Sequence, residues 1–569
     1  MTRFIVHAAV AMALLGGCIV QAQPDYSLAA VSSMVKVHRE MHRNSASLLT
    51  EAAGRPLQLD GARGEYVHGQ IVIVPGNEDL TGLVWSAEPL RGPQGATIPL
   101  SIRVVGYLKT EKPDYDVDFV GWWPDPLLSH LTTVDVPVGA CQPLWVTVGI
   151  PREARPGVYE GEVRVSVGAN AQAMSVRLQV RSFEIPKTRH LRVAGNYIEN
   201  QVPPYYGTAW FYGTAWNDKL KWQYRQFILD HRLNVHSIYG LLPAQDESVE
   251  DLKRLLAEGQ NVFMIGGSDV YGLTWSFAGI EDPEWCEIVD GILKRARAAG
   301  IPDEMLWFYG YDESGEDSRP EMIATSQKAK ERYPQVRLMT TARFKDMGGD
   351  DELGQTIDAW CPLTPSYEKW TGAIAAARAR GKEVWWYICV HPYHPYANWF
   401  IEYPAIEARL LMGMMAWEYQ PDGFLYYAWN IHGWPFEMRE NDKLIDDGPL
   451  CQWNPASFQD YNGDGCLFYY GIDGPVSTIR LENLTDGLED YEYFWVLQDL
   501  VDKLRNNDEL RRTREGGLAL RTARRCLKVP PSTVETLASF THDPAEVERV
   551  RSAVADAIEA LLALGLTQG

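Results

Sequence analysis

The sequence of 569 residues has few cysteines, no excess of positive charge and no long hydrophobic run after its first residues. Its 8 cysteines form no CxxC pair and have no regular spacing, which argues against a zinc module and against a disulfide framework. The 53 basic and 75 acidic residues give a net charge of −22, so no nucleic-acid partner is expected. No later stretch reaches 18 uninterrupted apolar residues, which excludes an integral membrane protein.

The composition that remains is that of an ordinary globular protein, with 46% apolar and 22% charged residues. The length exceeds a single domain of roughly 150 residues. Tryptophan and tyrosine are frequent, with 20 and 28 copies. These side chains suit core packing or stacking on sugar rings, and composition does not choose between the two.

The N-terminal residues have the pattern of a signal peptide. Arg3 precedes an apolar run, Phe4–Leu15, which is too short to span a bilayer. A small-residue cleavage site at Ala22 predicts a signal peptide over residues 1–22 and an exported protein, periplasmic or secreted. A lipobox-like sequence ending at Cys18 gives the alternative of a lipid anchor, and we favour soluble release.

A β-rich domain is predicted over residues 24–186. Runs with a period of two residues begin at Gly69, and in the last of them Val176, Leu178 and Val180 alternate with polar residues. Turn signals such as Pro156-Gly157 separate the runs. This pattern predicts an antiparallel β-sandwich.

After residue 186 the pattern changes to short apolar runs that alternate with amphipathic segments. Eight strands are predicted, at Leu191–Ile198, Val235–Tyr239, Asn261–Ile265, Met305–Tyr311, Val336–Thr341, Asp358–Pro362, Glu383–Val390 and Gly423–Trp429. Eight such alternations predict a (β/α)8 TIM-type barrel over residues 187–506. Residues 507–569 are predicted to be a helical tail that packs against the barrel.

The active site of such a barrel lies at the C-terminal ends of its strands. The fourth predicted strand is followed by two adjacent carboxylates, Asp312 and Glu313. Burial and mutual repulsion would raise the pKa of one of them, which gives the protonated and ionised pair that glycoside hydrolysis needs. The alternative is structural: Asp312 caps the next helix and Glu313 is solvated.

The order of the two domains and several motifs resemble glycoside hydrolase family 123. The motifs are Tyr311-Asp312-Glu313, the segment Ser477–Glu482 and the tail Asp486–Tyr493. Further matches lie in the sandwich, at Pro156–Gly161, and on the last predicted strand, at Gly423–Asn430. Thr485 departs from the pattern, where arginine is expected.

The resemblance implies a β-N-acetylgalactosaminidase that works by substrate assistance, with Asp312 and Glu313 as its catalytic residues. Glu313 would be the general acid and base, and Asp312 would orient the 2-acetamido group of the sugar, whose oxygen attacks the anomeric carbon. Retention of configuration follows. The expected partner is a glycan.

Other strand ends supply candidate substrate-binding residues. Arg343 follows the fifth strand, Tyr387 lies in the seventh, and Trp429 and Asn430 close the eighth. A tryptophan beside an asparagine offers a sugar an apolar face and a polar edge. Each has a structural alternative: an ion pair for Arg343, core packing for Tyr387, and burial under a loop for Trp429.

Two further candidates lie in the loop after the seventh strand. Glu402 can meet sugar hydroxyls or form a salt bridge with Arg409. His391 and His394 lack the helical spacing of a metalloprotease site, so no metal and no cofactor are expected. Two other functions compete with the leading one: a glycosidase of different specificity, with Glu402 or another carboxylate as nucleophile or base, and a non-catalytic glycan-binding protein.

Overall fold

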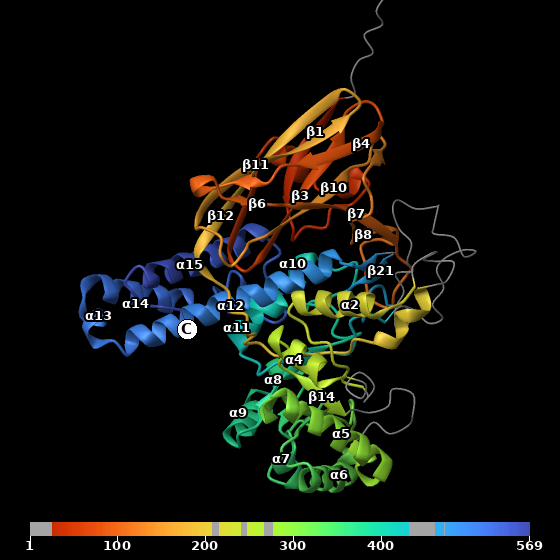
Figure 1. Cartoon of the computed structure of the whole chain (residues 1–569), viewed down its shortest axis with the longest axis vertical. Helices are drawn as coiled ribbons and strands as arrows, with labels where there is room; N and C mark the ends of the chain where they lie inside the picture. The colour runs from red at the N-terminus through yellow and green to blue at the C-terminus, as the bar shows by residue number, and fades with distance from the viewer. Residues whose placement is uncertain are drawn as a thin grey trace, which may run out of the picture.

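The computed structural model describes residues 25–206, 215–239, 247–266, 277–431, 461–471 and 473–568. Figure 1 shows three parts: the N-terminal strands at the top, a layer of long helices across the middle, and alternating strands and helices below. The predicted signal peptide, residues 1–22, lies outside the described residues, so its assignment stays a prediction.

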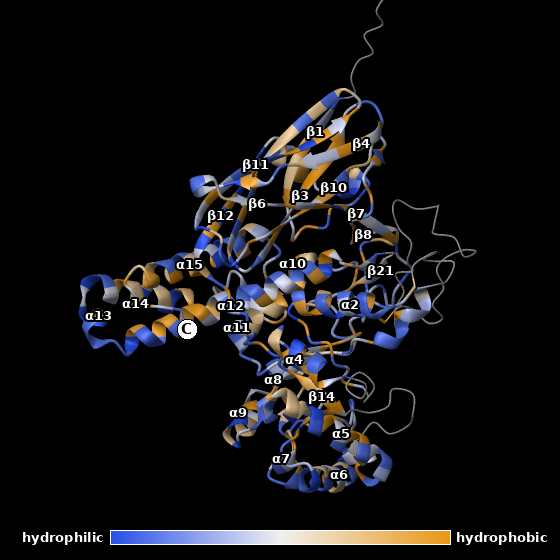
Figure 2. Ribbon diagram, viewed as in Figure 1, coloured by the Kyte–Doolittle hydropathy of each residue, from blue (hydrophilic) through white to orange (hydrophobic). Residues whose placement is uncertain are grey.

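The N-terminal part consists of two sheets that share a core, as expected for a sandwich. Figure 2 shows hydrophobic residues along two of its central strands, β3 and β10. One sheet has the order β1(Tyr26–Ser32), β3(Tyr66–Pro75), β10(Gln142–Gly149), β7(Ser101–Lys109) and β8(Trp122–Leu128). The path of the other is β2(Leu57–Arg63), β12(Asn170–Glu184), β11(Gly157–Val167), β4(Leu80–Ala87) and β9(Val134–Val136), with the short β5(Leu90–Arg91) and β6(Thr97–Ile98) attached to β11.

The period-two pattern is confirmed in β12, where Val176, Leu178 and Val180 are buried and the residues between them are more exposed. The prediction of a purely antiparallel sandwich is wrong in one place, because β2 pairs with β12 in parallel. The chain neighbours of β2, β1 and β3, lie in the other sheet, so β2 joins the edge beside β12 without a hairpin connection that would impose an antiparallel direction.

The β/α part contains two parallel sheets. One joins β14(Phe263–Gly266), β15(Leu306–Tyr309), β16(Arg337–Thr340), β17(Ala359–Trp360) and β18(Glu383–Val384). The other joins β13(Val193–Ala194), β20(Phe424–Tyr426) and β19(Trp386–Ile388). Each strand lies inside or within one residue of a predicted segment, and the predicted segment Glu383–Val390 contributes one strand to each sheet.

The second predicted strand, Val235–Tyr239, does not form. Only Ser237 makes an isolated parallel bridge, to Gly195. Side-chain amides take the places of ladder bonds here: Gln260 Oε1 accepts from Val235 N at 3.0 Å, and Asn234 Oδ1 accepts from Asn261 N at 3.1 Å. The backbone is therefore satisfied without a strand.

The helices between the strands begin and end where local chemistry dictates. Helix α5(Pro283–Ala299) starts after Asp282, whose side chain accepts from Glu284 N, and ends at Gly300, which has φ +80°. Helix α6(Arg319–Arg332) has a proline in its first turn, where no backbone N–H is needed. The remaining helices of this region and the helices before it are α1(Ala46–Ala52), α2(Asp218–Asp230), α4(Val249–Ala257), α7(Glu352–Thr356), α8(Thr364–Lys369), α9(Thr371–Ala379), α10(Ala405–Leu410) with the π-helical η8(Leu411–Met415), and α11(Ala416–Tyr419).

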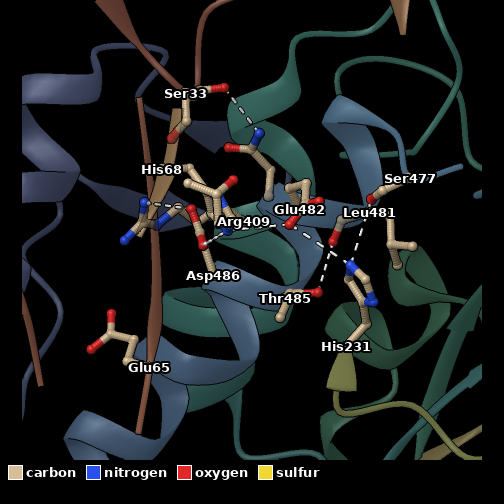
Figure 3. Close-up of polar contacts among 12 residues, drawn as sticks. Ser33, Glu65, His68, His231, Arg409, Ser477, Leu481, Glu482, Thr485 and Asp486 are labelled. Atoms are coloured by element: carbon tan, nitrogen blue, oxygen red, sulfur yellow. Dashed lines mark hydrogen bonds and ion pairs between the residues drawn. The ribbon is translucent and has the colours of Figure 1, made fainter. Parts of the chain in front are cut away.

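The middle layer is organised by α12(Ile479–Arg505), which contacts α10, η8 and α15(Pro544–Leu562). Its first half is buried although it is rich in charge. Figure 3 shows Glu482 and Asp486 of this helix among His68 of the sandwich, His231 and Arg409. The tail is mostly helical, as predicted, with α13(Asp508–Arg512), α14(Arg514–Cys526) and a small hairpin, β23(Val534–Thr536) and β24(Ser539–Phe540). Within the described residues, no helix is long and apolar enough to cross a membrane.

Candidate active site

The acidic pair lies directly after β15, on backbone of unusual conformation. Tyr311 and Glu313 have φ values of +56° and +48°, in the left-handed region that non-glycine residues rarely adopt. Such conformations cost on the order of 1–3 kcal/mol each and persist only where neighbouring contacts enforce them. Here Thr340 Oγ1 donates to Tyr311 O at 3.1 Å, and Thr341 Oγ1 accepts from Glu313 N at 2.9 Å. The strand end therefore holds both carboxylates in a fixed, strained geometry.

Asp312 is largely enclosed and is held by hydroxyl groups. Its Oδ1 accepts from the Tyr309 hydroxyl and, at 2.9 Å, from Thr341 Oγ1. Burial raises the pKa of Asp312 and the charge of Glu313 adds to this, while the two hydroxyl donors and the nearby Arg343 oppose it. The expectation that the surroundings raise the pKa of one acid of the pair is thus met at Asp312.

Glu313 accepts hydrogen bonds from two candidate residues that lie at other strand ends. The Tyr387 hydroxyl donates to Oε1, and Arg343 Nη2 donates to Oε2. Tyr387 is buried, and burial raises its pKa well above the ordinary value, so the phenol remains a donor. The Arg343 side chain is 62% exposed, which places it on the open side of the pair. The structure therefore brings Asp312, Glu313, Arg343 and Tyr387 together, as the strand-end argument predicted.

Glu402 is not placed as predicted. The Tyr115 hydroxyl donates to its Oε2 at 2.7 Å, and Asn462 Nδ2 donates to its Oε1. Its alternative partner, Arg409, instead pairs with Asp486 and Asp490. Glu402 thus joins the sandwich loop that carries Tyr115 to the β/α part of the chain. Neither a contact with Arg409 nor an open carboxylate is found.

Trp429 and Asn430 are also interior residues. Trp429 is 0% exposed, donates from Nε1 to Asn234 O at 3.1 Å, and packs so closely on Gly195 that a Cβ there would lie 1.8 Å from its ring. Asn430 bonds both backbone groups of Ile198 and the Tyr470 hydroxyl. The sugar-stacking role predicted for Trp429 is corrected to core packing, because its ring has no free face.

Other tryptophans from the sixth predicted strand onward lie in the interior as well. Several of these rings are fully buried: Trp360, Trp385, Trp386 and Trp399. Trp434 and Trp453 lie outside the described residues. Tryptophan frequency therefore reflects core packing in this part of the chain.

Several polar residues beside the pair were not predicted from the sequence. Tyr309 and Thr341 lie inside predicted strands, and their hydroxyls meet only in the folded protein. In the sequence, the one indication of a role was that each is a polar residue near the end of an apolar run. Asp464 lies on the loop before residues 469–471. It is buried, accepts from the Tyr426 and Tyr427 hydroxyls at 2.8 and 2.7 Å, and its pKa is raised by burial to about 6. The charges of Asp464 and Glu313 both act on Cys389. The loop with Asp464 therefore lies at the same end of the strands as the acidic pair.

The arrangement offers acid–base chemistry. It combines two carboxylates in different surroundings, two buried phenols that donate to them and one exposed guanidinium. Over the described residues, no group of three histidine, cysteine or acidic side chains could hold a metal ion. One enclosed and one accessible carboxylate in different surroundings suit the acid–base chemistry of glycoside hydrolysis.

Comparison with known families agrees with that class: the chain is a glycoside hydrolase. A family model described as the glycoside hydrolase 123 catalytic domain matches residues 281–497, which include the pair, and a model of the glycoside hydrolase 123 N-terminal domain matches residues 37–167. The chain belongs to glycoside hydrolase family 123, as the sequence motifs indicated.

Solved structures support the fold. A family 123 glycoside hydrolase from Clostridium perfringens, studied for glycolipid glycan hydrolysis, is 13% identical with a TM-score of 0.65, over 95% of this chain and 100% of that one. Two others match weakly. β-Glucuronidase 3 of Bacteroides uniformis has a TM-score of 0.27 and 9% identity over 77% and 50% of the chains, and a putative β-galactosidase of Bacteroides fragilis has 0.24 and 10% over 64% and 52%. A comparison with curated proteins finds no match.

Proposed function

We propose that this glycoside hydrolase is exported and removes β-linked N-acetylgalactosamine from glycans, with retention, by a mechanism in which the 2-acetamido group of the sugar is the nucleophile. The observation that carries the proposal is the unequal pair: Asp312 is enclosed by hydroxyl donors, and Glu313 faces an exposed arginine. Two neighbouring acids in such different settings take different roles.

Glu313 acts as general acid and then as general base. It delivers a proton to the leaving oxygen and afterwards takes one from the attacking water. Its Oε2 lies on the side of Arg343, whose exposed side chain can move away when a sugar enters. Tyr387 keeps its hydrogen bond to Oε1 and thereby fixes the carboxyl plane.

Asp312 acts on the acetamide. As a carboxylate it accepts the acetamide N–H, turns the carbonyl oxygen toward the anomeric carbon and stabilises the positive charge of the oxazolinium-like intermediate. An enclosed carboxylate performs this better than a solvated one, because the interaction with the developing charge is less screened. The protein then needs no nucleophile of its own.

Arg343 and Tyr387 are the substrate-contacting residues in this proposal. The side-chain oxygens of Glu402 and Asn430 already have protein partners, and Trp429 has no free face. The Clostridium perfringens structure was studied for glycolipid glycan hydrolysis, and glycolipid glycans are therefore the first substrates to examine.

We further propose that the two parallel sheets are arcs of one (β/α)8 barrel. Strands β18 and β19 are consecutive and pair with β17 and β20, so a single segment links both arcs. The bridge from Gly195 to Ser237 extends β13 toward β14, and the last junction is made by the paired amides of Asn234 and Asn261. Asp312 and Glu313 then lie at the C-terminal face of the barrel.

Chromogenic β-glycosides test the mechanism. The purified protein should hydrolyse the 2-acetamido-2-deoxy-galactoside and should have far lower activity on the 2-hydroxy analogue. An NAG-thiazoline-type compound with galacto configuration should inhibit far better than the free sugar, because it mimics the cyclic intermediate. Equal turnover of both glycosides, or a fluorosugar adduct on Glu402 or another carboxylate, would replace this mechanism by a double displacement.

Export is tested by fractionation of the native host. The proposal places the full chain outside the cytoplasm, with processing after Ala22 and release in soluble form. Labelling by a lipid precursor that is lost in a Cys18→Ser variant would instead establish the lipid anchor.

A further inference from the structure

Two hydroxyl groups meet at one oxygen of Asp312. The Tyr309 hydroxyl and Thr341 Oγ1 both donate to Oδ1 and lie 2.8 Å from each other. Both residues are buried. They come from neighbouring parallel strands, Tyr309 from β15 and Thr341 from the residue after β16. The contact therefore links the two strand ends that carry Asp312 and Arg343.

The hydrogen atoms at this junction can be counted. Thr341 Oγ1 accepts the backbone N–H of Glu313 at 2.9 Å and has one hydrogen of its own, and Tyr309 also has one. Both hydrogens are used when Asp312 Oδ1 accepts twice, which requires an acceptor oxygen. Burial raises the pKa of Tyr309 well above its ordinary value, so this hydroxyl keeps its hydrogen. Oδ1 therefore cannot carry a proton itself, and the two donated hydrogen bonds favour the ionised form of Asp312.

Thr341 reaches both acids at once. It donates to the side chain of Asp312 and accepts from the backbone of Glu313, the residue with φ +48°. A threonine hydroxyl is both donor and acceptor, and a serine supplies the same groups, whereas valine of the same shape supplies neither. This residue is therefore positioned to hold the strained strand end and the carboxylate together.

We propose that Tyr309 and Thr341 are positioning residues that keep Asp312 as a carboxylate and turn its Oδ2 toward the substrate. The proposal rests on the proposed function, in which Oδ2 receives the acetamide N–H. It extends that function by assigning the proton state of Asp312 to a specific pair of hydroxyls. Neither hydroxyl is placed in contact with the sugar.

Other groups also bear on the charge of Asp312. From its own loop, Glu313 disfavours the carboxylate, and Arg343 from the next strand end favours it. The remaining titratable groups that feel its charge come from other strand ends: Tyr239, Cys361 and Cys389. These are neutral at working pH, because burial raises the pKa of each. The two hydroxyls are thus the neutral groups whose removal shifts the balance without removing a charge.

The test is the pH profile of kcat for hydrolysis of the 2-acetamido aryl galactoside. Tyr309→Phe and Thr341→Val should each move the acidic limb to higher pH by about one pH unit, because a hydrogen bond to a charged group is lost. Each should lower kcat about 10-fold or more on the plateau with little change in KM. Thr341→Ser should restore both the limb and the rate.

Tyr333→Phe is the matched control. Tyr333 is a buried tyrosine that packs edge-on against Phe308 of β15, the strand that carries Tyr309. Its hydroxyl donates to Cys286 O. Its loss should leave the acidic limb unchanged. In an Asp312→Asn background, Tyr309→Phe should have little further effect on kcat, since the carboxylate it serves is gone.

The outcomes separate this proposal from the proposed function. Strong thiazoline inhibition of the wild type, with acidic limbs that do not move in Tyr309→Phe and Thr341→Val, would overturn the positioning role alone. Weak inhibition and a trapped carboxylate would overturn the substrate-assisted function. Thermal melting identifies variants that do not fold. If a single variant does not fold, the pH profiles of Thr341→Ser and of the double variants decide whether the hydroxyls position Asp312.

Discussion

The molecule has two acid-rich regions, and only one of them is built for chemistry. Helix α12 carries Glu482, Asp486, Glu489, Asp490 and Glu492 within eleven residues, whereas the end of β15 carries two carboxylates. These five acids are buried, and four of them pair with a basic side chain: Glu482, Asp486, Asp490 and Glu492. Arg103 lies 2.7 Å from Glu482, and Arg409 lies 2.7 Å from Asp490. Arg409 also pairs with Asp486 at 3.2 Å (Figure 3).

The difference lies in the partners. Burial opposes ionisation of Glu482, yet the charge of Arg103 holds its pKa well below the ordinary value. At the β15 end, neutral hydroxyls hold Asp312, and the arginine beside Glu313 is exposed. A buried carboxylate that is paired with an arginine cannot exchange this partner without leaving a buried charge unpaired, so it serves structure. An acid that is held by neutral donors at a surface can still change its protonation state or its partner.

Cavity size does not make the same distinction. A cavity of about 330 Å³ lies beside α12, between the sandwich and α15. Its wall includes Glu65, His68, Arg409, Asp486 and Arg551. These side chains form ion pairs with one another and are not directed at an empty binding site. The chemistry of the partners, and not the empty volume, identifies the site.

The comparison predicts the largest loss of turnover for Glu313→Gln. The amide cannot deliver a proton, so hydrolysis of a glycoside with a poor leaving group should fall by about 10²–10⁴-fold. An activated aryl leaving group should partly rescue the rate, and product affinity should persist. The measurement is kcat on paired natural and aryl substrates. Wild-type turnover of a natural disaccharide would show that Glu313 is not the acid.

The next largest loss is predicted for Asp312→Asn. The amide leaves the charge of the intermediate uncompensated, which should lower kcat by on the order of 10²–10³-fold and weaken thiazoline binding. Asp486→Asn on α12 is the matched comparison, which removes a carboxylate of the other region. It should change folding stability and leave kcat of the folded protein near wild type. If Asp486→Asn abolished turnover in a folded protein, the division between the regions would fail.

Stability should show the reverse order. Arg551 of α15 is buried and pairs with Glu65 of the sandwich and Asp490 of α12. Arg551→Met leaves two buried carboxylates without this partner and should cost about 3–5 kcal/mol of unfolding free energy. Arg549→Met, on the same helix, removes an exposed pair with Glu546 and should have little effect. Denaturant unfolding measures both, and equal effects would mean that the buried network adds nothing.

The sequence predicted the position of the site better than its lining. Apolar runs marked most strands, and the rule that parallel strand ends gather at one edge brought Arg343 and Tyr387 to Glu313. The same rule failed for Trp429, because the end of a run does not tell which way a side chain points. The rule also did not identify Tyr309 and Thr341, because their hydroxyls meet at Asp312 only when β15 and β16 pair. The structural role of α12 depends on charges from distant segments, which no local pattern reveals.

The smallest effect, on stability alone, is predicted for His68→Gln of the sandwich. Burial lowers the pKa of His68 from 6.5 to about 4, and its Nε2 lies 3.2 Å from Glu482. A group whose pKa is lower in the folded state contributes stability that is present above pH 6.5 and is lost as pH falls toward 4. The difference between the two pKa values corresponds to about 3 kcal/mol. The unfolding free energy of wild type should therefore fall more steeply than that of His68→Gln between pH 6.5 and 4, while kcat at pH 7 stays near wild type. His42→Gln, at an exposed position, should keep the wild-type slope, and parallel slopes for wild type and His68→Gln would show that this histidine titrates alike in both states.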